Sequence, residues 1–455
     1  MIGPVSASMQ HAGKGFDPLG IVASHPERFP FLLQSNAPGP QGRFDLLFGF
    51  PGECLTLWPD GRLEGPHAKA GRFLDALDAW YRSDRVEQPE RKSSLPFTGG
   101  WFLYLGYELA GEIEPKLALP KTGTPIAMAV RVPSAVIVDR TTGSLRLVDE
   151  SDDPDRLQTM REALHAAGCR NDGIADRLPE PARVTEADPA EYLEGVLRIL
   201  HYIREGDVFQ VNLSRGWELA YAQPPDPVAL YGALRTANPG PFNGLALFEE
   251  LTILSSSPER LIEVSNGRIR TRPIAGTRPR GRNSEDDARL SAELIAHPKE
   301  RAEHVMLIDL ERNDLGRVSR TGSVHVSEFM TLEHYAHVHH IVSEVTGTLR
   351  PETTPGKIIE AVFPGGTITG CPKVRCMEII AEIEGEGRGA YTGSMGYLDH
   401  RGHMDLNILI RTLVQEGDRV RFRTGAGIVA DSVPERELDE TRAKALGLLK
   451  ALGVA

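Results

Sequence analysis

Short runs of strand-forming residues follow one another along most of this chain, without the regular strand–helix–strand spacing that parallel sheets require. The runs at 43–50 and 135–139 are bounded by Pro, Gly and Asp, as short strands between turns usually are. A Gly-containing turn at 141–144 leads into another run at 145–148, which is a hairpin signal. The segment 261–271 repeats this pattern. The sequence therefore predicts antiparallel strands and argues against a doubly wound parallel sheet.

The chain has 455 residues, of which 40% are hydrophobic. This length can bury a large core and suggests two or three domains. We expect a loosely ordered N-terminus at 1–27 and an N-terminal subdomain at 28–168. A polar, Pro-containing linker at 169–186 and a catalytic domain at 187–453 complete the predicted organisation.

A helix is predicted directly after the linker. Asp188 can cap its first turn, and Pro189 suits its first position. Apolar residues then recur at helical spacing as far as Gly206, where a helix can end. A strand is expected next, over 208–213.

The chain carries 51 basic and 63 acidic residues, a net charge of −12. This balance argues against broad binding to nucleic acid or anionic membranes, so an anionic substrate would need a local cationic pocket. The 4 cysteines are too few and too scattered for a disulfide framework, and Cys371 and Cys376 are predicted to be reduced core thiols. Neither a signal peptide nor a membrane-spanning apolar stretch is found, so a cytoplasmic enzyme is expected.

The segment 425–444 combines a glycine turn with a helix that carries charge on one face. Gly425, Ala426 and Gly427 could bring bare backbone N–H groups close to an anion. Ser432 suits a helix cap, and Pro434 suits the first turn. The charged residues on one stripe of this helix are Glu437, Glu440 and Lys444. Carboxylates one turn apart could hold Mg²⁺, and a plain solvated acidic helix is the alternative.

Two further segments carry ionisable residues in positions that need an explanation. Glu303 lies among apolar positions of a predicted helix, so its carboxylate requires either a metal or a structural ion pair. His337 and His339 share one face of a predicted strand, and His340 takes the other. Histidine can transfer a proton near neutral pH without a large pKa shift. No acid or Cys lies at zinc-ligand spacing from these histidines.

Two more features favour an anionic ligand. A Gly- and Thr-rich turn at 363–373 enters a predicted helix, and its N–H groups and hydroxyls, that of Thr367 included, could bind an anion. This turn lacks the Walker pattern of nucleotide-binding loops. Arg411 is predicted to lie on an otherwise apolar strand over 407–412, where a bidentate carboxylate partner would explain it.

Taken together, these segments resemble the chorismate-utilising enzymes, a family that includes anthranilate, aminodeoxychorismate, isochorismate and salicylate synthases. The resemblance covers residues 186–452, with a weaker match over 28–150. It implies an α+β fold in which large antiparallel sheets pack as a sandwich with helices outside, and an active site between the two halves. It also implies chorismate as substrate and Mg²⁺ as cofactor.

The resemblance implies a role for individual residues. The expected metal ligands are Glu303, Glu437 and Glu440. The expected substrate-binding residues are Arg411, Tyr391, Lys444, Thr367 and the backbone of Gly425, Ala426 and Gly427. The expected catalytic residues are His340 beside the C4 hydroxyl, Gln210 beside the nucleophile, Glu259 as general acid and Thr277 lining the pocket.

The resemblance also indicates which reaction is catalysed. Gln210 stands where the water-using members carry a lysine base, so ammonia is the expected nucleophile, and the string Gln-Val-Asn-Leu at 210–213 resembles aminodeoxychorismate synthases. Gln34 replaces a glutamate of the regulatory segment typical of anthranilate synthases, which argues against tryptophan feedback. Ala275 argues the other way, because many aminodeoxychorismate synthases have a lysine there. We expect 4-amino-4-deoxychorismate as product, with anthranilate as the alternative.

The source of the ammonia must lie outside this chain. No cysteine stands in the Gly-x-Cys-x-Gly elbow of a glutaminase, and Cys371 is expected to be structural. The chain is therefore expected to use free ammonia, or ammonia from a separate glutamine amidotransferase subunit. No nucleic acid or membrane partner is expected.

Overall fold

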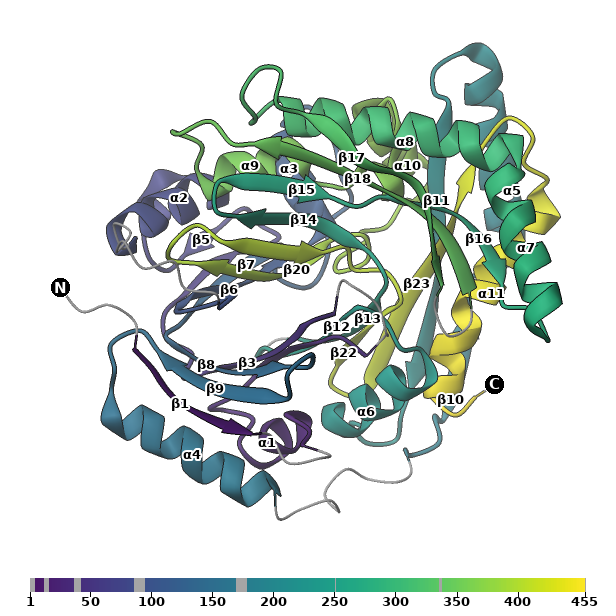
Figure 1. The fold of residues 1–455 in the computed structure, drawn as a ribbon. Coiled ribbons are helices and arrows are strands. Elements are labelled where there is room, and N and C mark those ends of the chain that lie inside the picture. Colours follow the sequence, from purple (N-terminus) through teal and green to yellow (C-terminus); the bar gives the residue numbers. More distant parts are fainter. Residues whose placement is uncertain are drawn as a thin grey trace.

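The computed structural model describes residues 5–11, 16–36, 42–85, 95–168, 178–249, 251–334 and 338–454. Two large antiparallel sheets lie face to face, and the longer helices lie outside them (Figure 1). The expectation of an α+β sandwich with outer helices is confirmed. No helix of the described residues is long and apolar enough to cross a membrane.

The first sheet has 12 strands. In spatial order they are β1 (Val5–His11), β9 (Ser144–Asp149), β8 (Ser134–Asp139), β3 (Phe44–Gly49), β2 (Phe31–Gln34), β12 (Phe242–Leu247), β13 (Thr252–Ser257), β22 (Thr412–Glu416), β23 (Arg419–Ile428), β11 (Gln210–Ala220) and β10 (Arg183–Glu186), with β19 (Gly370–Cys371) paired to β11.

The second sheet has 11 strands. Their order is β16 (Ile274–Pro279), β18 (Val338–Thr348), β15 (Arg268–Thr271), β14 (Arg260–Ser265), β21 (Met404–Asn407), β20 (Ser394–Asp399), β6 (Gly100–Leu105), β7 (Ala127–Val132), β4 (Cys54–Leu57) and β5 (Leu63–Glu64), with β17 (His325–His334) paired to β18. Both sheets contain strands from 28–168 and from 187–453, so these two segments share one core.

The core between the sheets is rich in aromatic side chains. Phe31 of β2 stacks on Phe102 of β6 with ring centroids 4.2 Å apart, which joins one sheet to the other. Phe48, Ile253 and Met395 are buried in the same cluster. Residues that alternate along each strand supply this layer from both sides, as expected for a sandwich.

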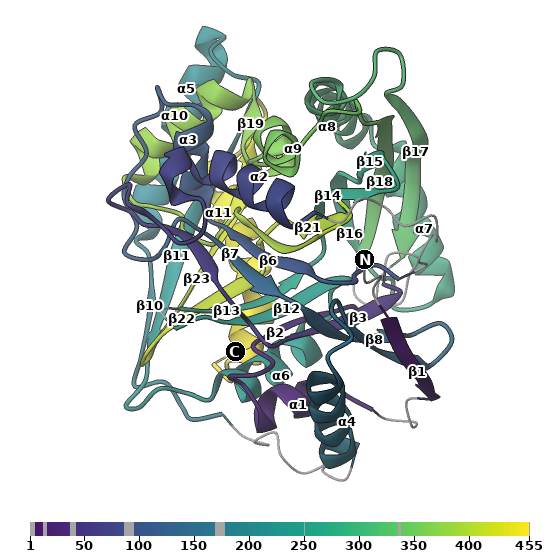
Figure 2. The same ribbon diagram turned by 90° about the vertical axis from the view of Figure 1, so that its left-hand side faces the viewer.

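The helices cover the outer faces of the sheets (Figures 1 and 2). Over the second sheet lie α2 (Phe73–Asp84), α8 (Pro298–Gly316) and α9 (Pro355–Val362), and against the first sheet lie α1 (Leu19–Ser24), α4 (Pro154–Gly168), α6 (Pro227–Ala237) and α11 (Pro434–Ala451). The others are α3 (Ala110–Ile113), α5 (Pro189–Glu205), α7 (Ser284–Ala296), α10 (Lys373–Glu384) and the 3₁₀ turns η1 (Ala68–Ala70), η2 (Tyr107–Leu109) and η3 (Gly366–Ile368).

The helix predicted after the linker is confirmed as α5. Asp188 Oδ1 accepts a hydrogen bond from Ala190 N at 2.8 Å, Pro189 is the first helical residue, and Gly206 ends the helix at φ 84°. Regular secondary structure is also found in two segments that were predicted to be irregular. The last residues of the predicted linker form β10, and α1 lies within the N-terminal segment that was expected to be loosely ordered, with Leu19 fully buried. Residues 169–177 of the linker lie outside the described part.

Three local predictions were wrong. Gly425, Ala426 and Gly427 do not form a turn, because they are part of β23 and pair with β11. Ser432 does not cap α11: its Oγ accepts from Val429 N at 3.0 Å, and the residue before the helix has no side-chain cap. Cys371 is partly exposed rather than in the core, although both it and the buried Cys376 are free thiols, as expected.

Candidate active site

The chain crosses from one sheet to the other twice within one small region. The first crossing links β13 to β14 and carries Glu259, and the second links β21 to β22 and carries Arg411. The crossings are bonded to each other, since Ile408 N donates to Glu259 O at 3.0 Å and Ser256 N donates to Arg411 O at 3.1 Å. Residues distant in sequence are thereby brought together where the two sheets meet.

Glu259 is almost fully buried at this junction. Burial raises the pKa of its carboxyl to about 7, against the lowering influence of the Thr367 hydroxyl, the Ile274 backbone and the charges of Arg411 and Lys444. A carboxyl with a pKa near neutrality can hold a proton and release it during a reaction. The predicted general acid therefore has the protonation behaviour that this role requires.

Arg411 does not lie on a strand, which corrects the expectation from its apolar neighbours. It precedes β22 with φ 52°, a left-handed conformation that is uncommon for a residue with a side chain. Burial lowers the pKa of its guanidinium, and Glu259 acts in the opposite direction. Within the described residues this guanidinium makes no hydrogen bond or ion pair. A partly buried cation of this kind is suited to binding an anionic ligand.

His340 lies on β18, in register with Thr277 of β16. Burial and the neighbouring Arg411 charge lower the pKa of its imidazole to about 4, although a hydrogen bond with the Gly276 backbone opposes this. The imidazole is therefore neutral near pH 7, contrary to the expectation of an ordinary histidine pKa. The other two histidines of this segment do not join it: His339 Nε2 lies 2.8 Å from Asp287 Oδ1, and His337 lies outside the described residues.

Gln210 begins β11 and is buried. Its amide Nε2 donates to Glu303 Oε1 of α8 at 3.1 Å. Because an ionised carboxylate can only accept, this contact fixes the orientation of the amide. Gln210 Oε1 is left buried, with no hydrogen-bond partner among the described residues. The contact joins the first sheet to the helix over the second sheet.

The strand β23 has one open edge beside Gln210. Its neighbour β22 pairs with it only from Arg419 to Phe422, so Gly425–Gly427 pair with β11 alone. A Cβ on Gly427 would collide with the Gln210 amide, and a Cβ on Gly425 would stand 2.7 Å from both Asn212 Oδ1 and the Tyr391 hydroxyl. Glycine is required here because side chains of β11 and Tyr391 occupy that space.

The backbone of these glycines faces the open edge. Asn212 N donates to Thr369 O and Ser214 N donates to Glu384 Oε1, so both groups point away from β23. In an antiparallel ladder the opposite residues, Gly427 and Gly425, then also direct N–H and C=O away from the partner strand. Gly425 O accepts from Lys444 Nζ at 2.9 Å. The predicted anion-binding backbone is therefore a strand edge rather than a turn.

The helix α11 runs alongside β23 and carries the predicted acidic stripe. Lys444 Nζ lies 2.8 Å from Glu440 Oε1, and both side chains are roughly half exposed. Glu437 and Glu440 both act on the pKa of the buried Tyr192, so they approach the same region. Within the described residues, no three His, Cys, Asp or Glu side chains have the spacing of a metal site. The donor set of carboxylate oxygens is nevertheless of the kind that Mg²⁺ prefers.

Comparison with known proteins identifies the family. The model for chorismate binding enzymes matches residues 59–450. The chain belongs to the chorismate-utilising enzymes. It is 42% identical over 437 residues to anthranilate synthase component 1 of Thermus thermophilus, which covers 93% of this chain and 92% of that protein. It is 40% identical over 398 residues to aminodeoxychorismate synthase component 1 of Bacillus subtilis, covering 84% and 83%.

A solved structure supports the same assignment. Anthranilate synthase component I from Streptococcus pneumoniae superposes with a TM-score of 0.79 at 30% identity, covering 98% of this chain and 100% of that one. The family resemblance expected from the sequence is confirmed. The similar proteins carry the names of two different synthases, so the product of this chorismate-utilising enzyme has to be argued from its own residues.

The predicted site residues of this chorismate-utilising enzyme are linked through their contacts. Gln210 joins Glu303 to Gly427, and Gly425 is next to Tyr391 and Lys444. Glu259 in turn interacts with Thr367, Arg411 and Lys444, and Arg411 with His340. The side chain of Thr277 lies outside the described part, although its backbone is opposite His340. Thr367 Oγ1 is buried, and its hydroxyl lowers the pKa of Glu259.

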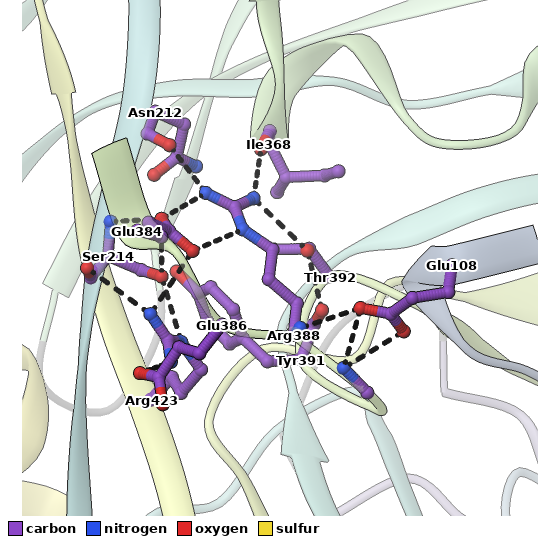
Figure 3. Close-up of polar contacts among 11 residues, drawn as sticks. Glu108, Asn212, Ser214, Ile368, Glu384, Glu386, Arg388, Tyr391, Thr392 and Arg423 are labelled. Atoms are coloured by element: carbon purple, nitrogen blue, oxygen red, sulfur yellow. Dashed lines mark hydrogen bonds and ion pairs between the residues drawn. The ribbon is translucent and has the colours of Figure 1, made fainter. Parts of the chain in front are cut away.

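One buried arginine connects several walls of this site (Figure 3). The guanidinium of Arg388 donates to Glu384 Oε1 and Oε2 at 2.6 and 3.0 Å, to Asn212 O at 2.7 Å, and to Ile368 O and Thr392 Oγ1 at 3.3 Å each. It also lies 5.5 Å from the centroid of the Tyr391 ring. Arg388 thus contacts β11, the turn that carries Thr367, and the residue predicted to bind substrate.

Glu384 extends this network to the open-edged strand. One of its oxygens accepts from Ser214 N at 2.8 Å and the other from Arg423 Nη2 of β23 at 3.1 Å. Burial raises the Glu384 pKa, but Arg388 and Arg423 more than offset this and keep the pKa below its usual value. Sequence reasoning missed this pair. The spacing Glu384-x-x-x-Arg388 was visible, but an i, i+4 pair is usually a surface feature.

Proposed function

We propose that this chain is the chorismate-aminating component of an aminodeoxychorismate synthase. It converts chorismate and ammonia to 4-amino-4-deoxychorismate and water, on the route to 4-aminobenzoate and folate. The observation that carries the proposal is the contact of Gln210 Nε2 with Glu303 Oε1 at 3.1 Å. This position holds a neutral amide, which cannot act as a base toward water. Ammonia is already nucleophilic in its neutral form and needs none.

Different residues at the sheet junction can bind the substrate, protonate the leaving group and orient it. Arg411 and the open edge of Gly425–Gly427 bind the carboxylates of the substrate dianion. Glu259 donates its proton to the C4 hydroxyl, which leaves as water while the lone pair of ammonia forms a bond to C2 and both ring double bonds shift. The new C2 ammonium then loses one proton, which restores the Glu259 carboxyl. Neutral His340 accepts a hydrogen bond from the substrate and orients the C4 hydroxyl.

A second ammonia then forms the C4–N bond as the C2 amine departs, so the net reaction consumes one ammonia and releases one water. This two-step route is required because Ala275 cannot attack C2, as the lysine of many aminodeoxychorismate synthases is thought to do. Ala275 is a buried residue of β16 and has no nucleophilic group. Intact-mass spectrometry during turnover should show no covalent substrate adduct, and a stable lysine adduct would overturn this route.

Glu303, Glu437 and Glu440 would hold Mg²⁺, which when bound neutralises a substrate carboxylate and withdraws charge from the ring. Glu303 supports this assignment because it lies beside Gln210, where the nucleophile is proposed to bind. Chelation with EDTA should abolish turnover, and Mg²⁺ should restore it.

The position of Gln34 supports the 4-amino product. Its Oε1 accepts from Arg235 Nη1 at 2.9 Å and from the Tyr231 hydroxyl at 3.3 Å, and its Nε2 lies 3.4 Å from Asp45 Oδ2. These structural contacts occupy the side chain that replaces a glutamate of the regulatory segment in anthranilate synthases. We therefore expect no inhibition by tryptophan.

Anthranilate synthase is the second candidate, favoured by Ala275 and by the names of several similar proteins. The deciding experiment incubates the chain with chorismate, Mg²⁺ and ammonium chloride at mildly alkaline pH and resolves the products by liquid chromatography and mass spectrometry. A product that an added lyase converts to 4-aminobenzoate supports the proposal. Fluorescent anthranilate with released pyruvate would overturn it in favour of the second candidate.

The ammonia donor is proposed to be a separate glutamine amidotransferase subunit in a heterodimer. Support comes from the absence of a glutaminase elbow in the sequence and from the name component 1 that the similar proteins carry. Glutamine alone should give no product with the purified chain, whereas ammonium chloride should.

A further inference from the structure

Two buried amide oxygens on one face of β11 lack hydrogen-bond partners among the described residues: Gln210 Oε1 and Asn212 Oδ1. A buried acceptor without a donor costs free energy and is uncommon in folded proteins. Residues i and i+2 of a strand share a face, with Cα atoms about 7 Å apart. A small molecule between the side chains could therefore hydrogen-bond to both oxygens.

The surroundings define which molecule would fit. Gln210 turns its nitrogen toward Glu303, so only its oxygen remains for a ligand. Asn212 Oδ1 lies over Gly425, next to the Tyr391 hydroxyl. Arg388 donates to the backbone oxygen of Asn212 at 2.7 Å, which holds this part of β11 in place (Figure 3). A pair of acceptor oxygens favours a ligand that carries several N–H donors and disfavours a carboxylate or hydroxide.

We propose that Asn212 is a specificity-determining residue of the site, and that its Oδ1 and Gln210 Oε1 together accept N–H groups of the ammonia nucleophile. This inference rests on the proposed aminating function and adds a second nitrogen-binding side chain to it. Ammonia held by two of its N–H groups keeps its lone pair free to point toward the substrate ring. The glycines opposite leave room for both amides, which explains why side chains are absent from that edge of β23.

The test compares Asn212→Leu with the wild type in steady-state kinetics, with ammonium chloride as nitrogen source and chorismate at saturation. Leucine has a similar volume and cannot accept a hydrogen bond. The Arg388 contact is made to the backbone and is retained. Loss of one hydrogen bond should raise the KM for ammonia about three- to tenfold, with the KM for chorismate unchanged within about twofold.

Two further variants separate hydrogen bonding from folding. Asn212→Asp keeps an acceptor oxygen and should keep the KM for ammonia within about threefold of the wild type. Asn243→Ala removes another buried asparagine with an unpartnered amide nitrogen, on β12, and should leave the KM for ammonia unchanged. Thermal denaturation of each variant reports whether it folds.

The outcomes are distinct. An unchanged KM for ammonia in Asn212→Leu, or equal rises in the KM for ammonia and chorismate, overturns the inference, because Asn212 would then hold only water or serve packing. If Asn212→Leu does not fold, the test rests on Asn212→Asp. A three- to tenfold rise in the KM for ammonia of folded Asn212→Asp likewise overturns the inference. A wild-type chain that forms no amino product at any ammonium concentration overturns the proposed function instead.

Discussion

Gln210 Nε2 and Glu303 Oε1 lie 3.1 Å apart and join β11 of the first sheet to α8, the helix that covers the second sheet. The contact fixes the orientation of the amide, because the nitrogen is engaged by Glu303 and the oxygen is left for another partner. It also places Glu303, a predicted metal ligand, beside the residue predicted to select the nucleophile. We therefore expect a coupling between nucleophile choice and metal binding through this contact.

Replacement of Gln210 by lysine tests this coupling. A lysine would pair with Glu303 and supply a base for water, so the ammonia-dependent rate should fall about 100-fold and a hydroxylated isomer of chorismate should appear. Product analysis by mass spectrometry measures the ratio of the hydroxylated isomer to the amino product. Gln415→Lys is the matched control, because Gln415 is another buried glutamine whose Nε2 donates at 2.7 Å, to Pro225 O. Retention of the amino product alone in Gln210→Lys would contradict the prediction.

Replacement of Glu259 by glutamine should abolish turnover and stabilise the protein at alkaline pH. The pKa of the Glu259 carboxyl in the folded protein is about 7, above its usual value of 4.5. The folded carboxyl is therefore protonated at low pH, and stability is lost as the pH rises through about 7, by about 3 kcal/mol when the loss is complete. Glutamine is neutral throughout, so the variant should have a higher Tm than the wild type at pH 8.5 and a similar one at pH 4.5.

The pKa of the Glu259 carboxyl also predicts how catalysis depends on pH. If Glu259 donates a proton, kcat/KM should fall as the pH rises through about 7 in the free enzyme. The measurement needs a constant concentration of free ammonia at each pH. A profile that stays flat to pH 9 would mean that another group supplies the proton.

Alanine at Gly425 should impair substrate binding. Its Cβ would lie 2.6 Å from Leu213 O and 2.7 Å from the Tyr391 hydroxyl. The strand would have to shift, which should cost about 1–3 kcal/mol of stability and raise the KM for chorismate about tenfold or more. Gly216→Ala on β11 is the control, since the nearest atom to its Cβ would be 3.9 Å away. Calorimetric titration with chorismate measures the effect on binding, and thermal denaturation measures the effect on stability.

Lysine at Arg388 should keep the charge but lose most of the network in Figure 3. An ammonium group cannot span the Glu384, Asn212 and Ile368 acceptors that the planar guanidinium reaches. Weakening a buried ion pair of this kind should cost about 3 kcal/mol of stability, and the shift of Tyr391 should raise the KM for chorismate.

Arg260→Lys provides a comparison for the Arg388 variant. Arg260 also forms a bidentate pair, with Asp405 at 2.9 and 3.0 Å, and although it follows Glu259 in the chain, both Arg260 and Asp405 line a different cavity. It should lower the Tm without changing the KM for chorismate. Equal effects of both substitutions on KM would show that the Arg388 network serves stability alone.

Local patterns in the sequence were sufficient for the strand-rich character of the chain and for α5 with its Asp188 cap and Gly206 end. These features depend on residues within a few positions of one another. Motifs long enough to recognise also identified the family, the acidic stripe of α11 and Glu303. The spacing of such residues along one helix is set by helix geometry alone.

The tertiary structure decided what those residues contact and how they are charged. Gly425–Gly427 became a strand edge because β11 pairs with it and β22 ends early. Arg411 lies where the chain crosses between the sheets, and its backbone oxygen accepts a hydrogen bond from Ser256 N, beside the crossing that carries Glu259. The pKa values of Glu259 and His340 moved in opposite directions from their usual values because burial disfavours the charged form of each. Burial and pairing arise from segments far apart in the sequence, and no local pattern contains them.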